Sequence, residues 1–238
     1  MDDQIKVMYF APIPRSKSRA EFKDRWRRHG RFAMTLPLWR FIDRYQHFDA
    51  MWPGEFGLTD ETCSAAGIDV RLGGVGCTWY RDRGTLDENL DVYDEALPLL
   101  KDEEEAFGRQ LGTDVVPVVE KRFISRRRPQ LALLSGFSAV PGVGREDFSV
   151  RWHSAGEKLV AIPEVERHLV TFAQNHSLDG FEGRDGLVEY GFAAAEDLAA
   201  FLAEPMLAEW TETDESPLID STRTQTIIGA EHVLFDCP

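Results

Sequence analysis

Residues 18–48 read SRAEFKDRWRRHGRFAMTLPLWRFIDRYQHF, and this stretch decides the fold. Ser18 and Glu21 have the S-x-x-E spacing of a capping box, in which each side chain satisfies a backbone N–H group that the first helical turn leaves without a partner. Pro37 has no backbone N–H and restricts the residue before it, so we expect the helix to end near Thr35. The stretch therefore predicts a capped helix, a proline break and an extended segment.

The helix and the extended segment each carry aromatic and titratable side chains on one face. Phe22, Trp26 and His29 are spaced i, i+4 and i+7, which places the imidazole on the same core-facing stripe as two large rings. After the proline the sequence alternates with a period of two, which predicts a strand that runs to Phe48. One face of that strand would hold Trp39, Phe41, Asp43, Tyr45 and His47. Aromatic bodies with a phenol, an imidazole and a carboxylate on one face are typical of a small-molecule pocket.

The same pattern returns in the second half of the chain. Phe148, Trp152, Gly156 and Pro163 follow Phe22, Trp26, Gly30 and Pro37 at a constant offset of 126 residues. Apolar runs at 6–10 and 131–137 predict first strands, those at 74–80 and 186–192 third strands, and those at 115–124 and 226–235 fourth strands. An acidic, amphipathic helix is expected after each third strand. Each half therefore has the order β-α-β-β-α-β of a ferredoxin-like fold.

A sheet with both helices on one face leaves its other, apolar face bare, and that face must be covered. We therefore predict an α+β protein made of two tandem ferredoxin-like repeats, residues 1–125 and 130–238, packed sheet to sheet. Since the chain supplies both sheets, we expect a monomer that is itself a pseudo-dimer, or a homo-oligomer of it.

The halves differ in the connection between the second and third strands. In the first repeat it spans residues 49–73, about the length at which loops are usually functional or disordered. Trp52 lies near its start. A mobile lid over a pocket of the first repeat and an inert surface loop both remain open.

Composition narrows the classes of partner. The 238 residues are 43% hydrophobic, enough for a packed core, and carry a formal net charge of −14, which gives no positive field for nucleic acid or anionic membranes. No apolar stretch approaches the length of a membrane helix, and residues 1–10 lack the basic and apolar regions of a signal peptide, so we expect a cytoplasmic protein. Cys63, Cys77 and Cys237 fit neither a disulfide framework nor a zinc site. We expect no metal, and Cys77 as a buried core thiol.

The motif E-F-x-x-x-W-x-x-H (Glu21 to His29), followed by a proline and by R-Y-Q-H (Arg44 to His47), resembles the EthD family of dimeric α/β barrel proteins. Two copies are fused here, so the resemblance implies an intramolecular dimeric α/β barrel. Relatives include the muconolactone methylisomerases, whose helix histidine and second-strand tyrosine are pocket residues. By motif position these correspond to His29 and Tyr45. The resemblance implies a small, aromatic or lactone-like substrate in a cavity between sheet and helices.

An imidazole and a phenol can remove and return a proton on one substrate, and no cofactor is needed for that step. We therefore predict His29 and Tyr45 as the catalytic residues of a cofactor-independent isomerase, dehydratase or cyclase, or decarboxylase of secondary or degradative metabolism, acting on a small cyclic or aromatic metabolite. The predicted substrate-binding residues are Trp26, Phe41, Asp43, His47, Trp79 and Trp52. Two alternatives stay open: a cofactor-free or haem-assisted monooxygenase, with His232 as the candidate axial ligand, and a non-catalytic small-molecule-binding accessory protein.

Only the first repeat is predicted to be chemically competent. At the offset of 126, His29 is matched by Ala155, and Tyr45 by Thr171, or by Phe172 if the strand slips by one residue. His153 lies two positions before the match of His29, roughly 200° round the helix, and should face elsewhere. We expect the second repeat to serve mainly as scaffold.

Overall fold

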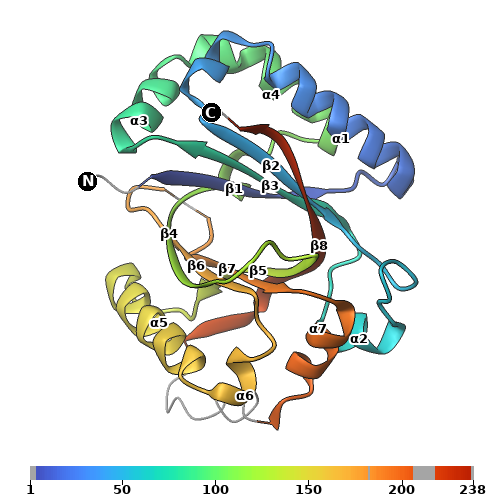
Figure 1. Ribbon diagram of the computed structural model, residues 1–238. Helices are drawn as coiled ribbons and strands as arrows, with labels where there is room; N and C mark the ends of the chain where they lie inside the picture. The colour runs from blue at the N-terminus through green and yellow to red at the C-terminus, as the bar shows by residue number, and fades with distance from the viewer. Residues whose placement is uncertain (1–3, 182, 206–217, 237–238) are drawn as a thin grey trace.

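The computed structural model describes residues 4–181, 183–205 and 218–236, and its strands close into one barrel in the order β1-β3-β2-β8-β5-β7-β6-β4 (Figure 1). The strands are β1 (Ile5–Pro12), β2 (Arg44–Ala50), β3 (Leu72–Tyr80), β4 (Val115–Ser125), β5 (Leu131–Ala139), β6 (Thr171–Ser177), β7 (Gly186–Phe192) and β8 (Ile219–Asp236). The helices are α1 (Arg19–Ala33), α2 (Asp60–Ala65), α3 (Arg83–Asp91), α4 (Tyr93–Phe107), α5 (Arg145–Val160), α6 (Pro163–Glu166) and α7 (Ala195–Leu202), with short 3₁₀ helices η1 (Pro37–Phe41) and η2 (Gly112–Asp114).

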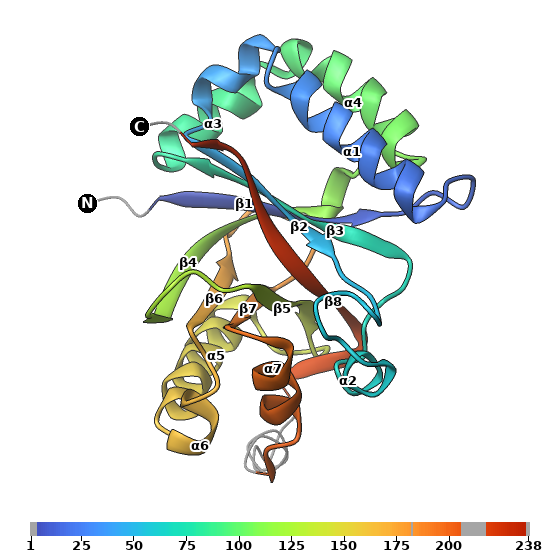
Figure 2. The same cartoon turned by 45° about the vertical axis from the view of Figure 1, so that its right-hand side comes forward.

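The fourth strand of each half belongs to both sheets. Strand β4 pairs with β1 through residues 115–119 and with β6 through 118–125. Strand β8 pairs with β5 through 219–229 and with β2 through 229–236. Helices α1, α3 and α4 cover one side of the barrel and α5, α6 and α7 the other (Figure 2). The predicted α+β fold of two ferredoxin-like halves packed sheet to sheet is confirmed, and the shared strands close it into a barrel.

The two halves pack their first helix in the same way. The phenylalanine and tryptophan rings of α1 have centroids 5.7 Å apart at 31°, and those of α5 have centroids 5.6 Å apart at 36°. In each half a glycine of the third strand faces that tryptophan. A Cβ built on Gly74 would lie 2.5 Å from Trp26, and one built on Gly186 would lie 2.6 Å from Trp152. Both halves therefore need glycine where helix and sheet approach most closely.

This match identifies the counterpart of Tyr45 in the second half. Tyr45 pairs with the residue four places after Gly74, and Phe172 pairs with the residue four places after Gly186. Of the two positions predicted, Phe172 is therefore the structural equivalent. A phenylalanine has no proton to exchange, so this position of the second half cannot act as an acid.

The segment after α1 differs from the prediction. Residues Pro37–Phe41 form the 3₁₀ helix η1, and β2 begins only at Arg44. The prediction of a strand from Trp39 onward is wrong, and Trp39 and Phe41 do not share a strand face with Tyr45. The fixed φ and missing N–H of proline suit the first turn of a helix, and this local preference outweighs the alternation of apolar residues.

The connection between β2 and β3 covers the second half of the molecule and is not a lid on the first. Met51, Leu58 and Cys63 are 4%, 3% and 3% exposed and belong to the hydrophobic core of the second half. Helix α2 packs against α7, and the Met51 N–H donates to the Ile228 carbonyl of β8 at 2.7 Å. The connection therefore extends the cover that the eight residues of α7 provide.

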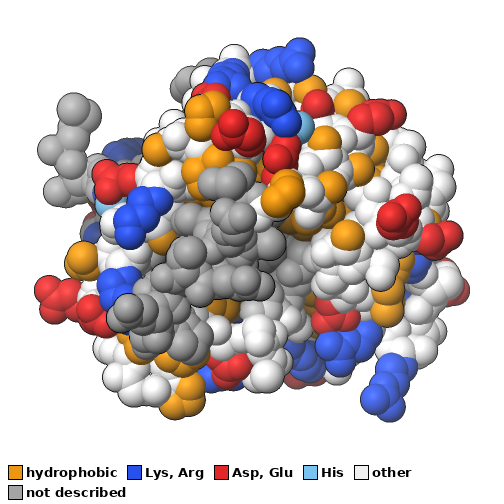
Figure 3. All heavy atoms as spheres, turned by 90° about the horizontal axis from the view of Figure 1, so that it is seen from below, with side chains coloured by type: hydrophobic (Ala, Val, Ile, Leu, Met, Phe, Trp, Pro, Cys, Tyr) orange, Lys and Arg blue, Asp and Glu red, His pale blue; other side chains and the backbone are white. Residues whose placement is uncertain are grey.

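The barrel interior is apolar along most of its length. Its buried residues include Met8, Phe10, Phe48, Val75, Cys77, Trp79, Val116, Val118, Leu134, Leu187 and Ile227. Cys77 is fully buried, as predicted. No helix in the described residues is long and apolar enough to span a membrane. On the face over the second half, acidic and basic side chains are interspersed (Figure 3).

Candidate active site

Four predicted site residues meet in the layer between the sheet of the first half and helices α1 and α4. Trp26, His29, Tyr45 and His47 are each 4% exposed or less. Tyr9 of β1 joins them, and the His47 ring lies parallel to the Trp26 indole with centroids 3.7 Å apart. We call Tyr9, Trp26, Tyr45 and His47 the aromatic cluster, and His29 lies beside it, edge-on to Phe107. The cluster is a closed packing of rings that holds polar atoms in its interior.

Hydrogen bonds fix the tautomer of His47. The guanidinium of Arg27 has only donors, so its Nη1 donates to His47 Nδ1 at 3.2 Å. The ring proton therefore sits on Nε2, which donates to the Tyr45 hydroxyl oxygen at 2.6 Å. The hydroxyls of Tyr45 and Tyr9 are 3.3 Å apart, and Trp26 Nε1 donates to the Tyr9 oxygen at 3.2 Å. The proton of Tyr45 thus points away from His47, toward Tyr9 or toward a ligand.

Burial sets the protonation states of these groups. Burial and the neighbouring Arg27 guanidinium hold the pKa of His47 well below its usual value. Burial raises the pKa of Tyr45 well above 10 and that of Tyr9 to about 12. Near neutral pH the imidazole is therefore neutral and both phenols keep their protons.

His29 forms a second polar group, on the α4 side of the cluster. Its Nδ1 lies 2.7 Å from Asp102 Oδ2, and Arg25 Nη2 donates to Asp102 Oδ1 at 2.6 Å. Burial opposes the charge on Asp102, but the bonds from Arg25 and His29 lower its pKa, so the carboxylate is ionised and only accepts. The shared proton is therefore on Nδ1, and Nε2 carries a lone pair. Burial lowers the pKa of His29, against the opposing hydrogen bond to Asp102, so this nitrogen stays unprotonated near pH 7.

Helix α1 links the two groups. Gly30, next to His29 in the sequence, lies against Tyr45: a Cβ built on it would be 3.2 Å from the Tyr45 hydroxyl oxygen. On its other side Tyr45 meets the ring of Trp39 edge-on, with centroids 5.2 Å apart. The Nε1 of Trp39 is buried and has no hydrogen-bond partner among the described residues. Buried N–H groups without partners are rare, so this one marks a place where an acceptor oxygen can bind.

The other predicted site residues lie elsewhere. Trp79 is in the barrel interior, on the opposite face of the sheet from Tyr45. Phe41 and Trp52 each pack under an arginine guanidinium, 4.3 and 3.8 Å from the ring centroid. Asp43 is half-buried, and its backbone N–H donates to the Trp79 carbonyl at 2.8 Å. The structure therefore does not bring these four residues to the aromatic cluster.

Sequence reasoning missed Tyr9, Arg27 and Asp102. Tyr9 lies in an apolar run, where a phenol has no distinguishing pattern. Asp102 lies in a run of four acidic residues, and only its spacing of four from the buried Ala106 could have indicated an inward direction. His232 is exposed on β8, directly across the strand pair from His47.

No protein-family profile and no curated protein matches the chain. Solved structures match it over nearly its whole length. A proposed monooxygenase from Lactobacillus acidophilus has a TM-score of 0.52 at 10% identity, covering 100% of this chain and 98% of that one. A proposed monooxygenase from Fusobacterium nucleatum has a TM-score of 0.54 at 8% identity, covering 98% and 94%. An anthrone oxidase-like protein has a TM-score of 0.57 at 9% identity, covering 98% and 93%. At these identities the likeness shows the fold, that of the dimeric α/β barrels, in a single chain.

Proposed function

We propose that the chain is an enzyme that transfers protons on a small cyclic or aromatic carbonyl compound, with the Tyr45 hydroxyl as acid and His29 Nε2 as base. The observation that carries this proposal is the hydrogen-bond chain from Arg27 through His47 to Tyr45, because it directs the phenolic proton away from His47 and leaves it for Tyr9 or a ligand. Proton transfer of this kind needs no cofactor. The motif resemblance to the EthD family and to the muconolactone methylisomerases, with a histidine and a tyrosine at these positions, supports the same pair.

Tyr45 and Trp39 are neighbouring donors in a closely packed layer, with ring centroids 5.2 Å apart. A substrate carbonyl that parts these rings would accept the Tyr45 O–H, and we place the unpartnered indole N–H of Trp39 as its second donor. Donors that point at the oxygen on which negative charge develops stabilise the transition state. When Tyr45 gives up its proton, the 2.6 Å bond from His47 Nε2 stabilises the phenolate that remains.

His29 completes the proton cycle. Its Nε2 lone pair takes a proton from the carbon next to the carbonyl, while Tyr45 protonates the oxygen and gives an enol. Return of both protons, with the carbon proton placed at a different carbon, yields an isomer. If His29 instead gives its proton to a neighbouring hydroxyl, which leaves as water, and the enol O–H returns its proton to Tyr45, the product is dehydrated. Asp102 keeps the base in the correct tautomer through its bond to Nδ1.

The names of the structural neighbours favour one alternative outcome, oxygenation. The same deprotonated carbon can combine with O₂ to give a peroxide anion, which takes up a proton and becomes a hydroperoxide. Loss of water from a hydroperoxide on a former methylene leaves a ketone, so one methylene compound and one O₂ give one ketone and one water. This path uses the same base and the same carbonyl-binding donors.

The test follows proton exchange and does not depend on the final product. Cyclic carbonyl compounds with an activated methylene, anthrone and an unsaturated five-membered lactone among them, are incubated with the protein in D₂O, and deuterium at the methylene is measured by NMR under argon. His29→Ala and Tyr45→Phe should each slow exchange by at least about 10²-fold while the fold is retained.

The matched control is His153→Ala, on the equivalent helix of the second half, which should exchange at the wild-type rate. Repeating the assay in air with an oxygen electrode separates oxygenation from isomerisation. If the compounds bind but none exchanges faster than in buffer, the chain is an accessory binding protein. If only His153→Ala abolishes exchange, the site is in the other half.

A further inference from the structure

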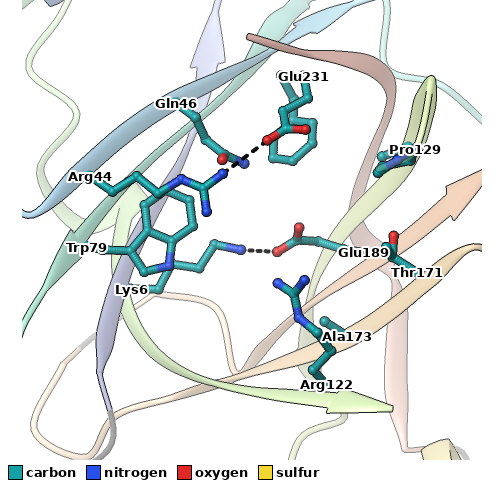
Figure 4. A pocket seen from close by; sticks show the side chains of 12 residues that line it. Lys6, Arg44, Gln46, Trp79, Arg122, Pro129, Thr171, Ala173, Glu189 and Glu231 are labelled. Atoms are coloured by element: carbon teal, nitrogen blue, oxygen red, sulfur yellow. Dashed lines mark hydrogen bonds and ion pairs between the residues drawn. The ribbon is translucent and has the colours of Figure 1, made fainter. Parts of the chain in front are cut away.

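A cavity of about 80 Å³ lies inside one end of the barrel, where β2, β5 and β6 begin (Figure 4). Its principal polar and aromatic lining residues are Lys6, Arg44, Gln46, Trp79, Arg122 and Glu189. These side chains point inward, on the opposite face of the first sheet from Tyr45. This barrel cavity is therefore separate from the proposed active site.

Lys6 gives the barrel cavity a buried positive charge. Its side chain is 1% exposed, its Nζ lies 3.1 Å from Glu120 Oε2, and it is also paired with Glu189. Burial lowers the pKa of Lys6, but the two carboxylates raise it further, so the ammonium stays charged. A buried charge is expensive unless it is paired and hydrogen-bonded. A lysine at an inward position of β1 therefore indicates a role other than packing.

A cation lies on each side of Trp79 in the sheet. Lys6 and Arg44 are its direct partners on the strands to either side. Lys6 Nζ lies 5.1 Å from the Trp79 ring centroid, and the Arg44 guanidinium carbon lies 4.9 Å from it. Attraction between each cation and the indole helps to hold the two charges in place at the cavity wall.

Several polar groups of the wall lack a partner. Arg44 Nε and Gln46 Oε1 are buried with no hydrogen-bond partner among the described residues, and Gln46 is 4% exposed. The Lys6 ammonium has three N–H groups and directs two of them to carboxylates. Buried polar groups in folded proteins are nearly always bonded. The wall therefore needs an acceptor near Arg44 and Lys6 and a donor near Gln46.

The formal charges that line the cavity do not cancel. The lining cations are Lys6, Arg44 and Arg122, and the lining carboxylates are Glu189 and Glu231. Glu120, outside the lining, pairs with Lys6 and Arg122. The lining itself therefore holds one more cation than carboxylate, in a chain whose net charge is −14. The local excess favours an anion in the cavity, where the low dielectric strengthens the attraction.

We infer that the barrel cavity binds a small α-hydroxycarboxylate of two or three carbons. Its carboxylate accepts N–H bonds from Arg44 and Lys6, which supplies the acceptor and balances the charge. Its hydroxyl donates to Gln46 Oε1, which supplies the donor. The volume of about 80 Å³ leaves room for a molecule of two or three carbons such as glycolate or lactate.

Calorimetric titration with sodium glycolate tests the inference, with acetate and glycolamide as comparison probes. Wild-type protein should bind glycolate at least about tenfold more tightly than acetate, which lacks the hydroxyl, and than glycolamide, which lacks the charge. Arg44→Met should weaken glycolate binding at least tenfold. The matched control Arg83→Met removes an exposed arginine paired with Asp87 on α3 and should leave binding unchanged.

Gln46→Leu is a second variant, and it should disturb the fold less than Arg44→Met, because the Gln46 amide oxygen has no hydrogen-bond partner to lose. It should reduce glycolate affinity to that of acetate and leave acetate affinity unchanged. Thermal unfolding of each variant checks that the fold is retained. Equal glycolate binding by wild type and Arg44→Met, equal binding of glycolamide, or a crystal soaked in glycolate with only water in the cavity would each overturn the inference.

Discussion

Replacing Asp102 with asparagine tests the His29 group without any knowledge of the substrate. Asparagine keeps the shape but loses the charge that accepts from Arg25 at 2.6 Å and from His29 at 2.7 Å. The remaining carboxylate near Arg25 is that of Glu105, which is 75% exposed. A hydrogen bond to a charged group contributes about 1.5–3 kcal/mol and a neutral one about 0.5–1.5. We therefore expect the variant to lose about 2 kcal/mol in free energy of unfolding at pH 8, where His29 is neutral.

The pH dependence of the free energy of unfolding has a definite sign. The folded pKa of His29 lies below its unfolded value, so falling pH destabilises the protein once the unfolded histidine takes up a proton, below about pH 6.5. Asp102 raises the pKa of His29 through its hydrogen bond and charge, so the asparagine variant should have a still lower histidine pKa. The stability gap between wild type and variant should therefore widen from pH 8 to pH 5.

Urea unfolding followed by tryptophan fluorescence at both pH values measures the gap, and NMR titration of the imidazole measures the pKa. Asp87→Asn, which breaks an exposed pair with Arg83, is the control and should change the unfolding free energy by less than about 0.5 kcal/mol. The assignment of His29 to Asp102 is refuted if the Asp102 variant behaves like this control, or if the gap narrows as the pH falls.

Three further outcomes follow from the geometry. Gly186→Ala places a Cβ 2.6 Å from the α5 tryptophan and should lower the free energy of unfolding by about 1–3 kcal/mol in urea unfolding, whereas Gly84→Ala, with its nearest atom at 3.5 Å, should be near neutral. Arg27→Met removes a neighbouring charge and should raise the pKa of His47 in an NMR titration, while burial still keeps that pKa below about 6.5; an unchanged pKa contradicts the tautomer assignment. Trp39→Phe removes a buried N–H that has no partner and should cost less than about 1 kcal/mol in the same unfolding assay, so a larger loss would mean that this N–H is bonded in the free protein.

Much of the fold could be predicted because its signals are local or repeated. The capping box of Ser18 and Glu21 forms as expected, and α1 ends at Ala33, two residues before the predicted end. The offset of 126 between the tryptophans identified the duplication. The strand from Trp39 failed because its alternation of apolar residues also suits a turn of 3₁₀ helix with Pro37 at its start.

The site could be predicted only in part, because its contacts depend on tertiary register. Motif spacing brought His29, Tyr45 and His47 into one layer but could not show that His47, and not His29, bonds to the Tyr45 hydroxyl. Which of the four acidic residues 102–105 bonds to His29 depends on how α4 is rotated about its axis where it packs on α1. The connection from Met51 to Cys63 was assigned to the wrong half, because apolar residues in a loop do not indicate which core they join.

The pairing of β8 with β2 has a consequence for synthesis of the chain. Residues 44–50 of β2 pair with residues 229–236 of β8, which leave the ribosome about 180 residues later. At about 5–20 residues per second this delay is roughly 10–40 s, during which the outer edge of β2 has no strand beside it. An unpaired strand edge is a template for association with other chains. The nascent protein should therefore depend on chaperones until its last strand is complete, and a chain truncated before β8 should aggregate.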